Sequence, residues 1–240
     1  MTADTDLDRR GSEPDDVAGG GPDATDDESS DDGRRGPGTG LWILLVVVAL
    51  VLGGAIGWRV TKSQDTAAPA RDSVDVGFFQ DMVSHHAQAV AMGYLYLQNG
   101  TDPLLRQIAT EIINYQNAEI GVMNDHLAQW GQQGTEGADA MAWMNMKVPR
   151  DQMPGLATNA QMDQLANARG QELNDLFTRM MILHHEGGIH MAEYAATHAG
   201  TATVRSWAQA MDDGQRGDIS EMNRWRLDHN LPAVQMTLIQ

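Results

Sequence analysis

The sequence predicts an all-α protein, in which a four-helix bundle of two duplicated αα-hairpins follows a single transmembrane helix. Three observations support this fold class: an uncharged apolar run near the N-terminus, a repeat at a constant offset, and helical spacing of apolar residues without strand-like alternation. The 240-residue chain has a formal net charge of −17 and no cysteine. Its composition therefore excludes disulfides and thiolate metal sites, and disfavours nucleic acid as a partner.

Residues 1–40 carry twelve acidic and four basic side chains and almost no large apolar ones. Such a segment cannot bury enough apolar surface to offset the entropy that is lost on ordering. We therefore predict a disordered acidic tail.

An uncharged apolar run extends from Leu41 to Trp58, and we predict a transmembrane helix over residues 41–60. A buried core helix and a cleaved signal peptide are the alternatives. Forty residues precede the run and no A-x-A-like cleavage site follows it, which favours an uncleaved anchor. Flanking basic residues are balanced and do not decide the orientation. The usual signal-anchor arrangement predicts a single-pass cell-membrane protein with an extracytoplasmic C-terminal domain, joined to the helix by a linker at 61–71.

A shift of 99 residues lays one half of the C-terminal region on the other without a gap. Rare residue types coincide at this offset, so chance is a poor explanation. The matched pairs include Phe78 with Phe177, Met82 with Met181, His85 and His86 with His184 and His185, Met92 with Met191, Gln116 with Gln215, and Met123 with Met222. We predict two duplicated units, at about 75–130 and 174–229, within a bundle that spans residues 72–232.

Each unit contains two helical patterns with a short break between them, at residues 98–103 in the first and 198–201 in the second. Glycine is typical of the position just after the end of a helix, and Thr or Asp is typical of the capping position just before the next helix begins. Each unit is therefore predicted to be an αα-hairpin, with core positions such as Ile108, Ile112, Tyr115 and Glu119. Residues 131–158 are rich in Gly and Met and are predicted to form the connection between the hairpins.

Histidine and methionine lie on one predicted helix face in each unit. Met82, His85 and Met92 are three and seven residues apart, and Met181, His184 and Met191 repeat this spacing. On the second helices, Met123 and Met222 face the same interior. Imidazole suits several transition metals, whereas thioether sulfur selects cuprous copper, so this donor set points to copper.

Methionine at helical spacing is also a common core residue, and this alternative stays open for the methionines taken alone. Neighbouring residues point about 100° apart on a helix, so one histidine of each pair would bind metal while the other supports it. His190 follows Glu186 by four residues, and the two are predicted to form an additional ligand pair in the second unit. His126, His198 and His229 have no counterpart at the 99-residue offset and are predicted to lie on the surface.

Two other metal motifs are absent. The second histidine of His185-Glu186-Gly187-Gly188-Ile189-His190 comes one residue too late for H-E-x-x-H, and no Glu is followed three residues later by His, as di-iron bundles require. The predicted copper ligands are His85, His86, His184, His185, His190, Met82, Met92, Met123, Met181, Met191, Met222, Glu119 and Glu186.

Four segments resemble the family known as domain of unknown function 305: FFQDMVSHH at 78–86, QNAEIGVM at 116–123, MPG at 153–155 and FTRMMILHHEGGIHM at 177–191. The resemblance covers about Asp75 to Leu231. It implies a ferritin-like four-helix bundle, usually exported, with some members tied to copper binding and tolerance. Asp218 replaces the usual Glu of the second unit, and Ser84 replaces the more usual proline before the first histidine pair.

Together these patterns predict a membrane-anchored protein that sequesters copper, delivers it or confers tolerance to it, and that has a metal donor or acceptor protein as a possible partner. Two alternatives remain. One is a metal-dependent oxidase that uses the histidine pairs as an open site. The other is a structural or signalling bundle in which the same residues only pack.

Overall fold

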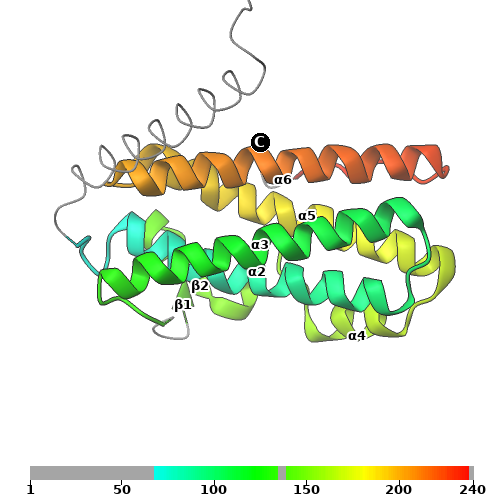
Figure 1. Cartoon of the computed structure of the whole chain (residues 1–240), viewed down its shortest axis with the longest axis horizontal. Coiled ribbons are helices and arrows are strands. Elements are labelled where there is room, and N and C mark those ends of the chain that lie inside the picture. Colours follow the sequence, from blue (N-terminus) through cyan, green and yellow to red (C-terminus); the bar gives the residue numbers. More distant parts are fainter. Residues whose placement is uncertain (1–67, 135–138, 238–240) are drawn as a thin grey trace, which may run out of the picture. The chain divides into compact units, whose positions relative to one another are not determined.

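The computed structural model describes residues 68–134 and 139–237, which form five α-helices (Figure 1). These are α2 (Val74–Asn99), α3 (Pro103–Gln129), α4 (Asn159–Asn167), α5 (Gly170–His198) and α6 (Ala202–Asp228). The all-α class is confirmed, and α4 is a helix that we did not predict. The predicted acidic tail and transmembrane helix lie outside the described residues. Within those ranges, no helix is both long and apolar enough to cross a membrane.

The long helices begin where the sequence places capping residues. The side chains of Ser73, Asp102 and Thr201 accept hydrogen bonds from backbone N–H groups in the first turns of α2, α3 and α6. Arg106 and Arg205 then close the two interhelical turns by donating to backbone carbonyls of the preceding segment. The predicted breaks between helices are therefore confirmed.

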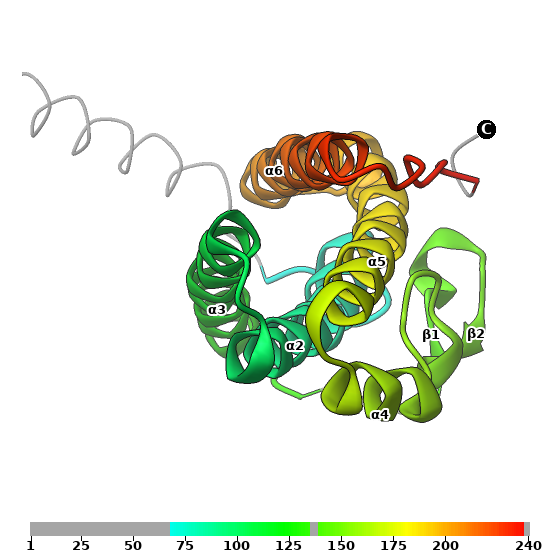
Figure 2. The same ribbon diagram turned by 90° about the vertical axis from the view of Figure 1, so that its right-hand side faces the viewer.

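The two hairpins, α2–α3 and α5–α6, meet through α2 and α5 (Figures 1 and 2). Helix α4 also packs on α2 and α5. The segment before α4 contains two very short antiparallel strands, β1 (Asp139–Ala140) and β2 (Val148–Pro149), and two single-turn 3-10 helices, η1 (Ala142–Met144) and η2 (Arg150–Gln152). The described part of the predicted connection therefore contains regular elements, and one of them, η1, packs on α2.

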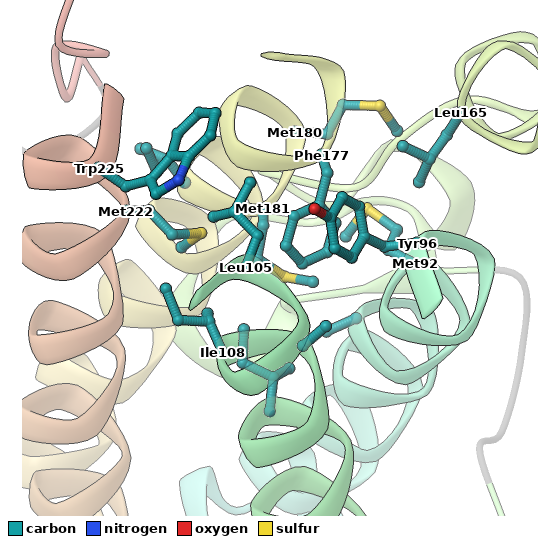
Figure 3. Packing of buried hydrophobic residues seen from close by; sticks show 14 of the residues in the cluster. Met92, Tyr96, Leu105, Ile108, Leu165, Phe177, Met180, Met181, Met222 and Trp225 are labelled. Atoms are coloured by element: carbon teal, nitrogen blue, oxygen red, sulfur yellow. The ribbon is translucent and has the colours of Figure 1, made fainter. Parts of the chain in front are cut away.

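Buried apolar side chains form two clusters. The first cluster contains Tyr96 stacked on Phe177, with ring centroids 4.3 Å apart, beside Leu105 and Trp225 (Figure 3). The second cluster contains Phe78, Phe79, Leu127 and Val204. The first includes Met92, Met181 and Met222, and the second includes Met82, Met123 and Met191. Each methionine of one set lies 99 residues from a methionine of the other set, as an internal duplication would require. The duplication itself stays a prediction.

Tyr115 was wrongly predicted to be a core residue. Its side chain is 71% exposed, whereas Ile108, Ile112 and Gln116 are buried. The buried face of α3 is narrow because the main partner of this helix is α2. The Tyr115 ring therefore lies outside the face of α3 that the described helices bury.

Candidate metal centre

Tertiary packing brings the two histidine pairs together. His85 and His86 lie on α2, His184 and His185 lie on α5, and all four side chains are fully buried. The rings of His85 and His184 are in contact, with centroids 3.8 Å apart and planes inclined by 32°. The contact lies between the two helices that join the hairpins, so each hairpin supplies half of the cluster.

The inner pair of histidines is oriented by backbone carbonyls. His85 Nε2 lies 3.2 Å from the carbonyl oxygen of Pro154, and His184 Nε2 lies 3.0 Å from that of His85. Because a carbonyl oxygen can only accept a hydrogen bond, Nε2 must carry the proton in both rings. In the neutral imidazole this tautomer leaves a lone pair on Nδ1.

The outer pair is oriented by carboxylates. His86 Nε2 lies 2.8 Å from Glu119 Oε2, and His185 Nε2 lies 3.0 Å from Asp218 Oδ2. Each contact joins residues 33 positions apart, so the two are equivalent at the 99-residue offset. A metal-binding imidazole commonly donates its other N–H to a carboxylate or carbonyl, which fixes the ring and raises its basicity. Glu119 therefore lies behind His86, on its Nε2 side.

The Nδ1 atoms of all four histidines are buried and have no hydrogen-bond partner. Gln116 Oε1 and both polar side-chain atoms of Gln215 are in the same condition. Each unpartnered buried polar group costs about 1–3 kcal/mol, so such a concentration calls for a ligand or ordered water. The four Nδ1 atoms are thus candidate metal donors.

Burial keeps the inner histidines neutral. Loss of solvation, followed by the effect of nearby His86, lowers the pKa of His85 to about 3. Burial and the adjacent His85 ring lower the pKa of His184 well below its ordinary value. Both rings are therefore uncharged at neutral pH and able to offer a lone pair.

We expect the metal-free protein to become less stable as the pH falls below about 6.5. In that range the unfolded chain protonates His85 and His184 while the folded chain does not, because the folded pKa values are lower. The free energy of unfolding should fall by up to about 1.4 kcal/mol per pH unit for each histidine. Urea unfolding between pH 4.5 and 8 measures this slope.

Replacing both histidines by glutamine should flatten the pH dependence, whereas His198→Gln, at an exposed position, should not. If the His85→Gln, His184→Gln double variant lost stability with falling pH as steeply as wild type, the pH dependence would not come from these two histidines.

Glycines allow the Pro154 segment to reach the histidines. A Cβ atom on Gly187 would lie 2.0 Å from Pro154 O, and one on Gly155 would lie 2.7 Å from His184 O. Gly155 also has a φ of +84°, which other residues rarely adopt. The sequence contains the signals for this contact, a Pro-Gly step at 154–155 and the Gly187-Gly188 pair, but their role follows only from the tertiary structure.

Gly187→Ala should destabilise the protein by about 1–3 kcal/mol, because the added methyl group meets backbone that belongs to the loop holding His85. Gly121→Ala in α3 is the matched control, since a Cβ there meets nothing within 4 Å. The free energy of unfolding of the Gly121→Ala protein should rise by up to about 1 kcal/mol, because alanine has a higher helix propensity than glycine. Chemical denaturation compares the two, and a Gly187→Ala protein as stable as wild type would show that the loop contact is dispensable.

The six predicted methionines are all fully buried in the two clusters. In residues 68–134 and 139–237, no three His, Asp or Glu side chains are arranged so that they could hold a metal ion. Zinc and di-iron centres are built from such nitrogen and oxygen sets. The donors that this part of the chain concentrates are imidazole nitrogen and thioether sulfur.

The two remaining predicted ligands, Glu186 and His190, follow the histidine pair on α5. Glu186 is buried and lines a cavity of about 250 Å³ together with Gly155, Met180 and Leu183. His190 is half-buried, with Nε2 3.3 Å from Met146 Sδ. Of the histidines predicted to lie on the surface, His198 and His229 are exposed, and His126 is half-buried beside Phe79 and Trp130.

Several solved structures resemble this chain. A DUF305 protein from Streptomyces coelicolor, named as a candidate secreted protein, is 30% identical with a TM-score of 0.65, covering 69% of this chain and 99% of its own. A DUF305 fragment from Deinococcus radiodurans is 26% identical with a TM-score of 0.56, covering 66% and 97%. CopM in its Cu(I)-bound form is 26% identical with a TM-score of 0.52, covering 65% and 96%.

CopM in its Cu(II)-bound form is similar to the same extent, at 25% identity and a TM-score of 0.52, covering 65% of this chain and 97% of that one. Among proteins of curated function, none matches. Residues 75–226 match the family described as Domain of unknown function (DUF305), and the chain, with its buried histidine pairs on α2 and α5, belongs to that family.

Proposed function

We propose that this protein binds copper through its buried histidine pairs. The observation that carries the proposal is the state of the four rings: each Nε2 is held by an oxygen acceptor, while each Nδ1 is buried without a partner. That is the arrangement of a supported metal-binding imidazole before it receives its ion. The similarity to CopM, solved with Cu(I) and with Cu(II), supports copper as the ion.

The inner rings of His85 and His184 are the proposed principal donors, because they are in contact across the two hairpins and are neutral. Met82 and Met181 precede these histidines by one helical turn and are the proposed sulfur donors. Cuprous copper accepts such soft donors at low coordination number, so it is the preferred oxidation state. The sequence also predicts His86, His185, His190, Met92, Met123, Met191, Met222 and Glu186 as ligands. Glu119, which the sequence placed in the same set, accepts from His86 Nε2 and is proposed to support that ring.

The proposed role is sequestration or delivery of copper outside the cytoplasm, or tolerance to it, by a domain anchored through residues 41–60. The uncharged run there supports the anchor, and the Streptomyces coelicolor relative, named as a candidate secreted protein, supports the location. Copper is then cargo, exchanged with a donor or acceptor protein.

The test is a Cu(I) titration of the full-length protein against a chromophoric competitor without oxygen. In the test variant, His85, His86, His184 and His185 are replaced by glutamine, whose amide nitrogen mimics Nε2 while the Nδ1 donor is lost. The control carries glutamine at His126, His198 and His229. We expect affinity to fall at least 100-fold in the test variant and to be unchanged in the control. Wild-type binding no tighter than about micromolar, or wild-type affinity in the test variant, would overturn the proposal.

A further inference from the structure

A histidine and a methionine meet on the surface, away from the buried histidine pairs. His190 of α5 and Met146, which lies between η1 and β2, approach to 3.3 Å between Nε2 and Sδ. We propose that these two side chains form a second, surface site for cuprous copper, through which the protein is loaded. The inference rests on the proposed copper-binding function and adds the place where the ion first binds.

The position of Met146 is fixed by hydrogen bonds that lead back to α2. Its backbone N–H donates to the carbonyl of Met141, and the N–H of Met141 donates to the buried carboxylate of Asp81. The pairing of β1 with β2 and the ion pair of Lys147 with Asp139 hold the rest of this hairpin. Met146 is therefore presented to His190 by an ordered segment.

The exposure of Met146 distinguishes it from its neighbours. Its side chain is 41% exposed, whereas Met141, Met144 and Met153 of the same segment are buried. A thioether held at the surface beside an imidazole gains little from packing but provides two donors that suit cuprous copper.

Binding at this site requires only a small rearrangement. The Nε2 proton moves to Nδ1, so that the neutral ring offers its Nε2 lone pair, and the ion takes the place of that proton between nitrogen and sulfur. With ligand distances of roughly 2.0–2.3 Å, like those of zinc, the two atoms must separate slightly from their present contact. The flexible side chain of Met146 allows this movement.

The proposed site is followed in the sequence by a residue of a methionine-rich buried cluster. Met191 directly follows His190 and is fully buried in the second cluster. That cluster contains seven methionines: Met82, Met123, Met141, Met144, Met153, Met191 and Met211. Met82 of the same cluster precedes His85 and His86 by one helical turn, so one buried cluster contains a methionine close in sequence to each of the two proposed sites. Exchange between soft ligands would carry the ion inward.

The test uses the full-length variants Met146→Leu and His190→Gln, each of which removes one donor and keeps a side chain of similar size. Met236→Leu and His198→Gln are the matched controls, because both residues are exposed elsewhere. Cu(I) stoichiometry is measured by titration, and the loading rate by stopped-flow mixing with a Cu(I)–chelator complex.

We expect each test variant to bind one equivalent of Cu(I) fewer than wild type and to load its tight sites about tenfold more slowly, with unchanged tight-site affinity. The variant that lacks His85, His86, His184 and His185 should keep the surface equivalent. Test variants that retain both wild-type stoichiometry and loading rate would overturn this inference while leaving the proposed function intact. A wild-type protein that binds no Cu(I) would overturn both.

Discussion

Asp81→Asn should lower the free energy of unfolding by about 3–5 kcal/mol, which is the usual cost of removing one partner of a buried ion pair. Asp81 is 3% exposed and accepts from three donors at 2.7–2.8 Å: the backbone N–H of Met141, Trp143 Nε1 and Arg150 Nη1. The amide would lose the charge that balances Arg150 and would turn its NH₂ group toward one of these donors. Urea unfolding followed by tryptophan fluorescence measures the loss.

Asp139→Asn, in the β1–β2 hairpin next to the segment that Asp81 of α2 holds, is the matched control. Its partner Lys147 and its own side chain are largely exposed, so the substitution should change stability by less than about 1 kcal/mol. If the Asp81→Asn and Asp139→Asn variants unfolded at the same urea concentration, Asp81 would not be holding the segment that contains Met141 and Met146.

Glu119→Leu should weaken Cu(I) binding about 10- to 100-fold without changing the number of ions bound. The carboxylate accepts from His86 Nε2, and loss of such a partner releases the ring and lowers its basicity. Glu119→Gln, which keeps an acceptor oxygen, should have a smaller effect. Competition titration measures both affinity and stoichiometry.

Glu111→Gln controls for the loss of charge, since Glu111 lies on the exposed side of the same helix and pairs only with Gln107 among the hydrogen bonds described. If Glu119→Leu removed a whole equivalent of copper, the carboxylate would be a direct ligand, contrary to the support role that its contact with His86 indicates.

The sequence by itself determined the helical class and the bounds of the hairpin turns, and it supplied the residues that we propose as copper ligands. These properties are local: capping residues such as Asp102 and Thr201 satisfy the first turns of their own helices, and apolar spacing predicts a buried face whatever covers it. The repeat at 99 residues also indicated that His85 and His184 occupy equivalent positions. The sequence did not predict helix α4, because only one of its nine residues, Leu165, is buried and apolar, and a single such position shows no helical period.

Only the tertiary structure decided which nitrogen of each histidine has an oxygen partner and which is buried without one. His85 meets Pro154 across 69 residues, and His184 meets the backbone of His85 across 99, so no local pattern encodes these contacts. The same holds for Met146 and His190, which the Asp81 anchor brings together from different segments. Periodicity specifies the side of a helix on which a residue lies, whereas tautomer, pKa and donor geometry follow from burial and from partners supplied by distant parts of the chain.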